Sequence, residues 1–118
     1  MNAEEQIIST SQVVMALLFS RCPRGGFDAD LFPTNAPPPN HEELVKRGAV
    51  YVATFAYRDG QIFAFPVDPQ DNLCRLIAAE TLPCFQRYIA GRFGTAEPVT
   101  NDSADWLTRL HALEDPRA

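Results

Sequence analysis

The sequence lacks most of the residues and motifs with which enzymes and metalloproteins do their chemistry. The 118 residues include two histidines and three cysteines, and no two cysteines form a C-x-x-C pair. His41 and His111 lie far apart in the sequence, among cysteines at unrelated spacings, which does not suit a metal site. No G-x-S-x-G, G-x-G-x-x-G or Walker sequence is present. We therefore predict no metal, no cofactor, no catalytic residues and a non-enzymatic function.

Positive charge is also scarce. Ten basic residues stand against fifteen acidic ones, which gives a formal net charge of −5, and the basic residues are scattered along the chain. Binding to nucleic acid depends on clustered lysine and arginine that displace counterions from the phosphates. We therefore expect a small acidic protein that does not bind nucleic acid.

No long hydrophobic run occurs. The apolar run over residues 13–19 is too short to span a bilayer, and the N-terminus opens with Glu4 and Glu5 where a signal peptide would carry basic residues. The odd number of cysteines favours reduced thiols over a disulfide framework. We therefore expect a cytoplasmic protein that does not associate with membranes.

The strongest structural signal is a β-hairpin over residues 49–67, AVYVATFAYRDGQIFAFPV. Asp59-Gly60 suits a two-residue type I′ turn between two runs of β-branched and aromatic residues. Counting outward from this turn places Arg58 opposite Gln61 and Pro66 opposite Ala53. The pair that contains Pro66 is a non-hydrogen-bonded one, in which the missing N–H of proline costs nothing.

Both faces of this hairpin are apolar, so both are expected to be covered, by helices, by a second subunit or by a target. One face carries Tyr51, Phe55, Tyr57 and Ile62, and the other carries Val50, Val52, Phe63, Phe65 and Val67. Two strands alone make a marginal sheet. Because Pro66 blunts one edge, we expect a third strand or a partner to add to the other edge, along residues 50–57.

Four to five helices are predicted around the hairpin. Ser9 and Gln12 have the spacing of a capping box for a helix that ends near Arg21, although Asn2 and Glu5 have the same spacing and would allow an earlier start. Residues 13–19 make the helix apolar nearly all round. Residues 22–40 are expected to form an ordered loop. Asn40 can then cap a short helix over residues 41–47.

Three further segments complete the predicted elements. Asp68 followed by proline indicates the start of a helix, which Pro83 is expected to break or kink before a second helix ends near Gly91. A third strand over residues 73–77 is an alternative, because short apolar runs fit either structure. The last helix follows Asn101 or Asp102 and carries an apolar stripe made of Trp106, Leu107, Leu110 and Leu113.

These elements predict a single α+β domain over residues 1–118, in which an antiparallel hairpin, completed by a third strand or a dimer partner, packs against four to five helices. The missing chemistry favours a protein–protein interaction module, such as an inhibitor, immunity or accessory protein of a mobile element. A homodimer that pairs two hairpin edges is expected. The interaction surface is predicted to comprise Tyr51, Ala53, Phe55, Tyr57, Val14 and Leu18.

An alternative function is that of a small-molecule binding protein or small enzyme with an aromatic-lined pocket between the hairpin and the helices. The residues that would line it are Phe55, Tyr57, Phe63, Phe65, Phe85, Tyr88 and Trp106. The same side chains would also suffice for an ordinary core.

Overall fold

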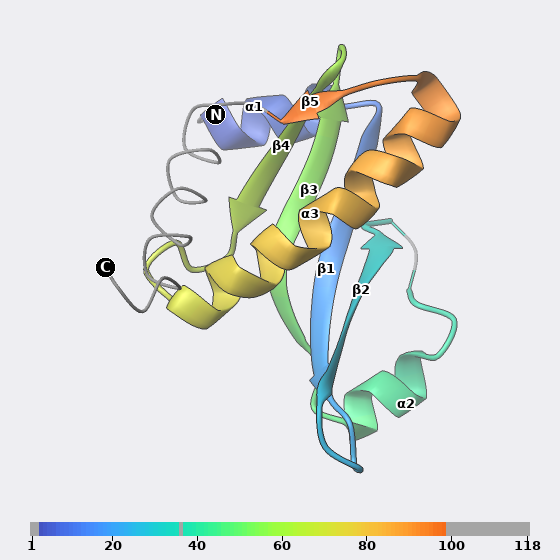
Figure 1. Ribbon diagram of the computed structural model, residues 1–118, viewed down its shortest axis with the longest axis vertical. Helices are drawn as coiled ribbons and strands as arrows, with labels where there is room; N and C mark the ends of the chain where they lie inside the picture. Colours follow the sequence, from blue (N-terminus) through green and yellow to red (C-terminus); the bar gives the residue numbers. More distant parts are fainter. Residues whose placement is uncertain (1–2, 36, 99–118) are drawn as a thin grey trace, which may run out of the picture.

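A five-stranded mixed sheet forms the centre of the structure, with its strands in the order β2-β1-β3-β4-β5 (Figure 1). The computed structural model describes residues 3–35 and 37–98. Along the chain the elements are α1 (Ala3–Thr10), β1 (Val13–Arg21), β2 (Phe27–Pro33), α2 (His41–Lys46), β3 (Val50–Arg58), β4 (Gln61–Pro66), α3 (Asn72–Phe93) and β5 (Glu97–Pro98). Over these residues the protein is α+β, with a larger sheet and fewer helices than predicted.

The predicted hairpin is confirmed as β3 and β4. Arg58 pairs with Gln61, and the register continues without a shift to Ala53 opposite Pro66. Asp59 and Gly60 take the positive φ angles of 51° and 86° that a type I′ turn requires. The turn residues therefore set the register of this pair of strands, as the sequence indicates.

The predicted helix up to Arg21 is wrong, because residues 13–21 form β1. This strand lies between β2 and β3 and pairs antiparallel with both. Every residue of β1 before Arg21 is buried or half-buried, and a central strand of this kind does not alternate between apolar and polar residues. The continuous apolar run therefore has the composition of a buried helix and the structure of a central strand.

The expected capping box does not start a helix. The hydroxyls of Ser9, Thr10 and Ser11 instead donate to the carbonyl oxygens of Gln6 and Ile7, at distances of 2.6 to 3.3 Å. The carbonyl of Ile7 is one of the last four of α1, which have no N–H partner further along the helix. The polar residues therefore close the helix that precedes them.

The expected loop over residues 22–40 contains β2, which pairs with β1 from Arg21 opposite Phe27 to Met15 opposite Pro33. The third strand that the hairpin needs also comes from this chain. It is β1, which pairs with β3 along the edge at which a partner strand was expected. The alternative of a strand over residues 73–77 is wrong, since these residues belong to α3. The short helix after Asn40 is confirmed as α2, although the Asn40 side chain makes no capping hydrogen bond.

The expectation of four to five helices fails partly because Pro83 does not end a helix. α3 runs unbroken from Asn72 to Phe93 with Pro83 inside it. Proline removes one N–H donor from the helix ladder. It is tolerated here because Pro83 is exposed, while its neighbours Leu82 and Phe85 are buried against the sheet. The part of the chain that the structure describes has three helices, and the helix expected after Asn101 or Asp102 lies outside it.

The start of α3 is displaced from the predicted position. The N-cap is Asp71, whose side chain accepts a hydrogen bond from the backbone N–H of Cys74 at 3.0 Å. The predicted cap, Asp68, forms a turn just before the helix and accepts from the N–H of Gln70. The composition therefore identifies a helix start correctly and misplaces it by one turn.

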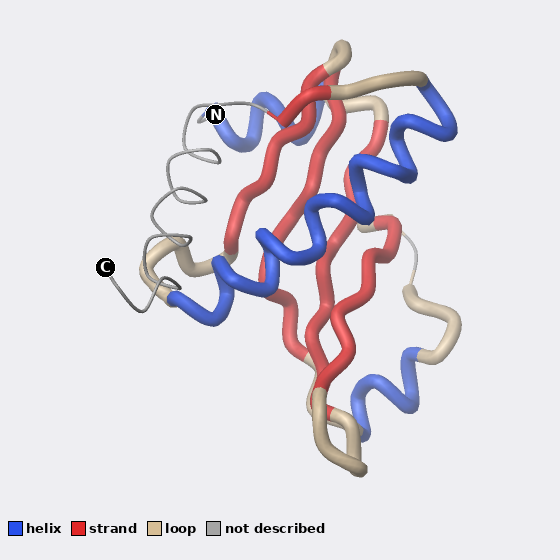
Figure 2. Tube along the Cα trace, viewed as in Figure 1, coloured by secondary structure: helices blue, strands red, loops and turns tan. Residues whose placement is uncertain are grey.

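The main core lies between α3 and one face of the sheet, which α3 crosses diagonally (Figures 1 and 2). Phe55 of β3 and Phe85 of α3 stack with their ring centroids 5.4 Å apart, and both are completely buried. Leu17 of β1 and Ile62 of β4 are equally inaccessible. The two central strands and the long helix thus hold the fold together.

A β-bulge in β3 changes which residues share a face. The pairing with β1 shifts between Leu17, opposite Ala53, and Leu18, opposite Tyr51, so that Val52 has no partner of its own. Tyr51 therefore lies beside Leu18, on the face away from α3, and not with Phe55 and Tyr57 as expected. Burial raises the pKa of Tyr51, and the carboxylate of Glu4 in α1 raises it further. This agrees with the position of α1 behind the sheet in Figure 1.

We predict that Pro83→Ala stabilises the protein. Alanine restores an N–H donor to the carbonyl of Ala79 and removes the clash of the proline ring, so the free energy of unfolding should rise by about 1–3 kcal/mol. Urea denaturation measures the change. Glu80→Ala, at another exposed position of α3, is the control and should change it by less than about 0.5 kcal/mol. A loss of stability in Pro83→Ala would contradict this account of the helix.

Candidate functional site

The outer edge of β2 is the candidate binding site, because its backbone groups point away from the sheet. The N–H of Thr34 donates to the carbonyl of Val14, and the N–H of Cys22 donates to that of Gly26. Hydrogen-bonded pairs alternate along an antiparallel ladder, so the even-numbered residues of β2 bond to β1. The odd-numbered residues Phe27, Ala29, Leu31 and Pro33 therefore face outward. None of their backbone groups bonds to another backbone group within residues 3–35 and 37–98.

The opposite edge of the sheet is closed. β5 pairs in parallel with the start of β4, at Gln61 and Ile62. Further along, Ala64 is buried and Pro66 has no N–H to offer a further strand. Within the described residues, β2 therefore offers a longer row of outward-facing backbone groups than the part of β4 that β5 leaves uncovered.

The side chains of β2 divide by charge between the two faces of the sheet. Ala29 and Leu31 pack against the core on the side of α3. Asp28 and Asp30 lie on the opposite side, because they pair with Ser20 and Leu18 of β1. Phe27, the first residue of the strand, is 53% exposed. The edge therefore combines open backbone groups with an acidic face and an accessible aromatic ring.

The two aspartates differ in their partners. Asp28 accepts hydrogen bonds from the guanidinium of Arg47, at 3.1 Å, and from the thiol of Cys22, at 3.2 Å. Arg47 also binds Glu43 of α2 at 2.6 Å, which links the start of β2 to that helix. Asp30 is exposed, and its carboxylate makes no hydrogen bond or ion pair with any residue that the structure describes. Asp30 is thus the carboxylate on this edge that is free to meet a partner.

Cys22 is a poor nucleophile in this setting. Its hydrogen bond to the Asp28 carboxylate raises the pKa of the Cys22 thiol, and desolvation and the negative charge of Asp28 act in the same direction. Reactive cysteines need the opposite shift, because the thiolate is the nucleophilic form. The neighbouring carboxylate therefore favours the protonated form of this thiol.

Cys74 has a structural role. Its thiol is buried and donates to the carbonyl of Val52 at 2.6 Å. The same carbonyl accepts from the N–H of Val67. Cys74 therefore fixes the first turn of α3 to the bulge of β3.

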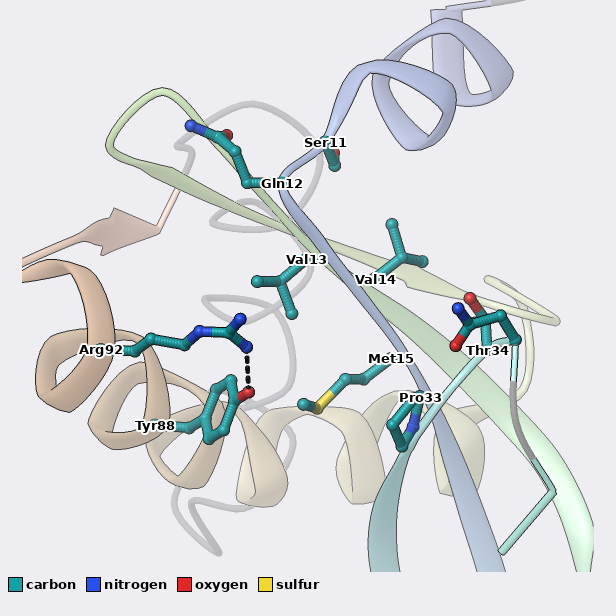
Figure 3. Close-up of a pocket in the computed structure, with 10 residues that line it drawn as sticks. Ser11, Gln12, Val13, Val14, Met15, Pro33, Thr34, Tyr88 and Arg92 are labelled. Atoms are coloured by element: carbon teal, nitrogen blue, oxygen red, sulfur yellow. Dashed lines mark hydrogen bonds between the residues drawn. The ribbon is translucent and has the colours of Figure 1, made fainter.

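A hollow of about 380 Å³ lies where β1 and the end of β2 approach the last turns of α3 (Figure 3). The guanidinium of Arg92 donates to the hydroxyl of Tyr88 at 2.7 Å. Val13 and Met15 point toward this pair, whereas Val14 points to the other side of the strand. Its remaining lining residues are mostly polar, namely Ser11, Gln12, Pro33, Thr34 and Asn35. Arg92 and the Tyr88 hydroxyl thus face Val13 and Met15, whereas Gln12 and Thr34 lie away from this pair.

The predicted interaction surface is divided between the two faces of the sheet. Ala53, Phe55 and Tyr57 are buried in the core under α3. Val14 and Leu18 are half-buried on the opposite face, where Tyr51 is 44% exposed. The structure therefore brings Leu18 and Tyr51 together as cross-strand neighbours, and it separates them from Ala53, Phe55 and Tyr57 on the other face.

The aromatic residues proposed as a pocket are mostly packed against other side chains. Phe55 stacks on Phe85, and Tyr57 stacks on Phe93 at 4.9 Å. Phe63 and Phe65 stack on each other, and their pairing with Ala56 and Thr54 puts them on the face away from α3. Tyr88 is the member of the set that lines the hollow of Figure 3, and Trp106 lies outside the described residues.

Comparison with known proteins adds no assignment: no family model, no curated protein and no solved structure matches this chain. Within the described residues, no group of histidine, cysteine and carboxylate side chains is arranged to hold a metal ion. None of the helices described is both long enough and apolar enough to cross a bilayer.

Sequence reasoning missed the open edge because residues 27–33 were assigned to a loop. The signal was present, since Phe27, Ala29 and Leu31 alternate with Asp28 and Asp30 in the period of a half-buried strand. Aspartate has a low β-propensity, and glycine and proline residues flank the segment on both sides. Those features indicated a loop and concealed the alternation.

We predict that Asp28→Asn speeds the alkylation of Cys22 by iodoacetamide at pH 8 several-fold. The amide carries no negative charge, so the pKa of the thiol falls toward its ordinary value and the thiolate fraction rises. Mass spectrometry of the labelled peptide gives the rate. Asp30→Asn is the matched control and should leave the rate unchanged. An equal rate in Asp28→Asn and the wild type would show that Asp28 does not control this thiol.

Proposed function

We propose that this chain is a non-enzymatic protein–protein interaction module, which takes up an extended segment of another protein along the outer edge of β2. The observation that supports this most directly is the row of outward-facing backbone groups at Phe27, Ala29, Leu31 and Pro33. An exposed edge of this kind is a template for pairing with another chain. The mode of binding would be β-strand addition, in which backbone hydrogen bonds supply much of the affinity.

The available hydrogen bonds are sufficient for a modest affinity. Phe27, Ala29 and Leu31 each offer an N–H and a carbonyl to an added strand, and each net hydrogen bond contributes about 0.5–1.5 kcal/mol. Burial of the exposed Phe27 ring would add apolar area to this sum. These contributions would have to outweigh the translational and rotational freedom that the peptide loses on binding.

We propose the cytosol as the place of this function, since all three cysteines are free thiols in the structure. Inhibitor, immunity and accessory proteins of mobile elements act through contacts with one partner, and we propose a role of this kind.

A homodimer stays a prediction. It would need a surface other than the edge of β3, which β1 occupies within the chain.

A second candidate function is the binding of a small organic anion in the hollow of Figure 3. The guanidinium of Arg92 supplies positive charge, and the hydroxyl of Tyr88 beside it supplies a further polar contact. Arg92 is held in place by its hydrogen bond to Tyr88 and by its position over the Phe93 ring, 5.2 Å from the centroid. A carboxylate of suitable size would find a preformed cation at this site.

We predict that Ala29→Pro weakens partner binding and leaves the fold intact. The N–H of Ala29 points outward, so proline removes a donor from the free edge and none from the ladder with β1. Pull-downs from the source cells with the wild type and with Ala29→Pro, each followed by mass spectrometry, identify proteins that bind only the wild type. A purified candidate should then bind Ala29→Pro at least about tenfold more weakly, a difference of about 1.4 kcal/mol.

The control for this experiment is Asp30→Pro, which removes an N–H from the β1–β2 ladder and should lower the melting temperature. Ala29→Pro should melt close to the wild type. If every protein retained by the wild type is retained equally by a folded Ala29→Pro variant, strand addition at β2 is not the mode of binding.

For the second candidate, we predict that one class of carboxylate raises the melting temperature in a thermal-shift screen and that Arg92→Ala removes the effect. A ligand at a hundred times its Kd adds about 2.7 kcal/mol to the free energy of unfolding. Arg87→Ala, which changes an arginine of α3 outside the hollow, is the control and should keep the shift. An equal shift in Arg92→Ala would place the ligand elsewhere.

A further inference from the structure

The acidic residues of β2 determine which strands can add to its edge. Asp28 and Asp30 project from the same face, at positions that bond to β1 and not to an added strand. In an antiparallel addition, such residues form the non-hydrogen-bonded pairs, in which facing side chains come closest, with Cα atoms about 4.5 Å apart. The residue opposite Asp30 would therefore lie close to its carboxylate.

A second copy of β2 fits this edge badly in antiparallel alignment. Two copies paired in this way are related by a two-fold axis that passes through one residue position of the strand. If that position is Ala29, Asp28 of each copy faces Asp30 of the other. If it is Asp28 or Asp30, that aspartate faces its own counterpart. Like charges directly opposite each other destabilise a pair of strands.

The remaining alignments lose hydrogen bonds. An axis through Leu31 or Phe32 brings Pro33 to a hydrogen-bonded position, where it has no N–H to donate. Alignments shifted further toward either end overlap by only a few residues. The charges and the proline thus work against self-pairing, as charged residues and proline do on other edge strands.

We propose that the segment accepted by β2 is basic, with a lysine or arginine opposite Asp30 and an apolar residue on its other face near Phe27. This inference rests on the proposed function. Its main support is charge complementarity, because Asp30 is exposed and has no ion pair within the described chain, whereas Asp28 is already bound by Arg47.

The preference for an apolar residue follows from exposed apolar side chains beside the first residue of β2. Phe27 is 53% exposed, and Leu73 at the start of α3 is 50% exposed. Together with Phe19, Arg21 and Gly26 they line a hollow of about 270 Å³. Phe27 and Asp30 lie on opposite faces of the strand, so an added strand would meet them with residues three positions apart. A basic and an apolar residue at that spacing are the expected recognition elements.

The test uses fluorescence polarisation with the full chain and three equal-length labelled peptides, in which valine alternates with lysine, with glutamate or with serine. The lysine peptide should bind about tenfold more tightly than the glutamate peptide, since exchanging an attractive for a repulsive cross-strand pair changes the affinity by about that factor. Added salt should reduce this difference in affinity between the two peptides.

Three variants test the role of each group. Asp30→Lys should reverse the preference for the lysine peptide over the glutamate peptide, and Asp30→Asn should reduce it. Ala29→Pro should abolish binding of all three peptides.

The outcomes separate this inference from the proposed function. If the serine and lysine peptides bind equally and Ala29→Pro abolishes both, strand addition stands and the preference for a basic segment is overturned. If none of the peptides binds, the inference is likewise overturned, while the pull-down comparison still decides the function. If light scattering shows a wild-type dimer that Ala29→Pro makes monomeric, the occupant is a second copy of the chain and the basic segment is ruled out.

Discussion

The pairing of β1 with β3 is the interaction on which the rest of the structure depends. It makes β1 a central strand, closes the edge of the hairpin and leaves β2 as the outer strand. It also produces the bulge at Val52. The carbonyl of Val52 accepts a hydrogen bond from the thiol of Cys74, which connects the sheet to the first turn of α3. A change in this pairing would alter both the core and the edge that we propose for binding.

The long helix gives the two faces of the sheet different roles. The face under α3 holds the main core, with Leu17, Phe55 and Phe85 completely buried. On the other face Leu18 is half-buried and Tyr51 is partly exposed, and the aspartates of β2 extend this face toward the outer edge. Two acidic residues, Asp28 and Asp30, thus lie beside the outer edge of β2, where backbone groups can form hydrogen bonds. Net charge alone could not have indicated this, because it contains no information on position.

The sequence was informative where local chemistry determines the structure and misleading where tertiary burial does. Asp59-Gly60 specifies its turn through φ angles that few other residues adopt, so the hairpin and its register could be predicted. Residues 13–21 have no period that distinguishes a buried strand from a buried helix, and pairing with two neighbouring strands decided the outcome. Pro83 stays within a helix because packing of its neighbours outweighs the loss of one donor. The candidate site was missed with β2, since an edge strand becomes visible only once the central strand is correctly placed.

Amide hydrogen exchange measured residue by residue along β2 tests the central claim, that the outer edge of this strand is open, most directly. Amides that bond to β1 should exchange slowly, and amides that face outward should exchange fast. We expect protection at Asp28, Asp30 and Phe32 and rapid exchange at Phe27, Ala29 and Leu31, so that protection alternates from one residue to the next. Uniform protection of all six amides would show that the edge is covered in the free protein, and strand addition at β2 would then be excluded.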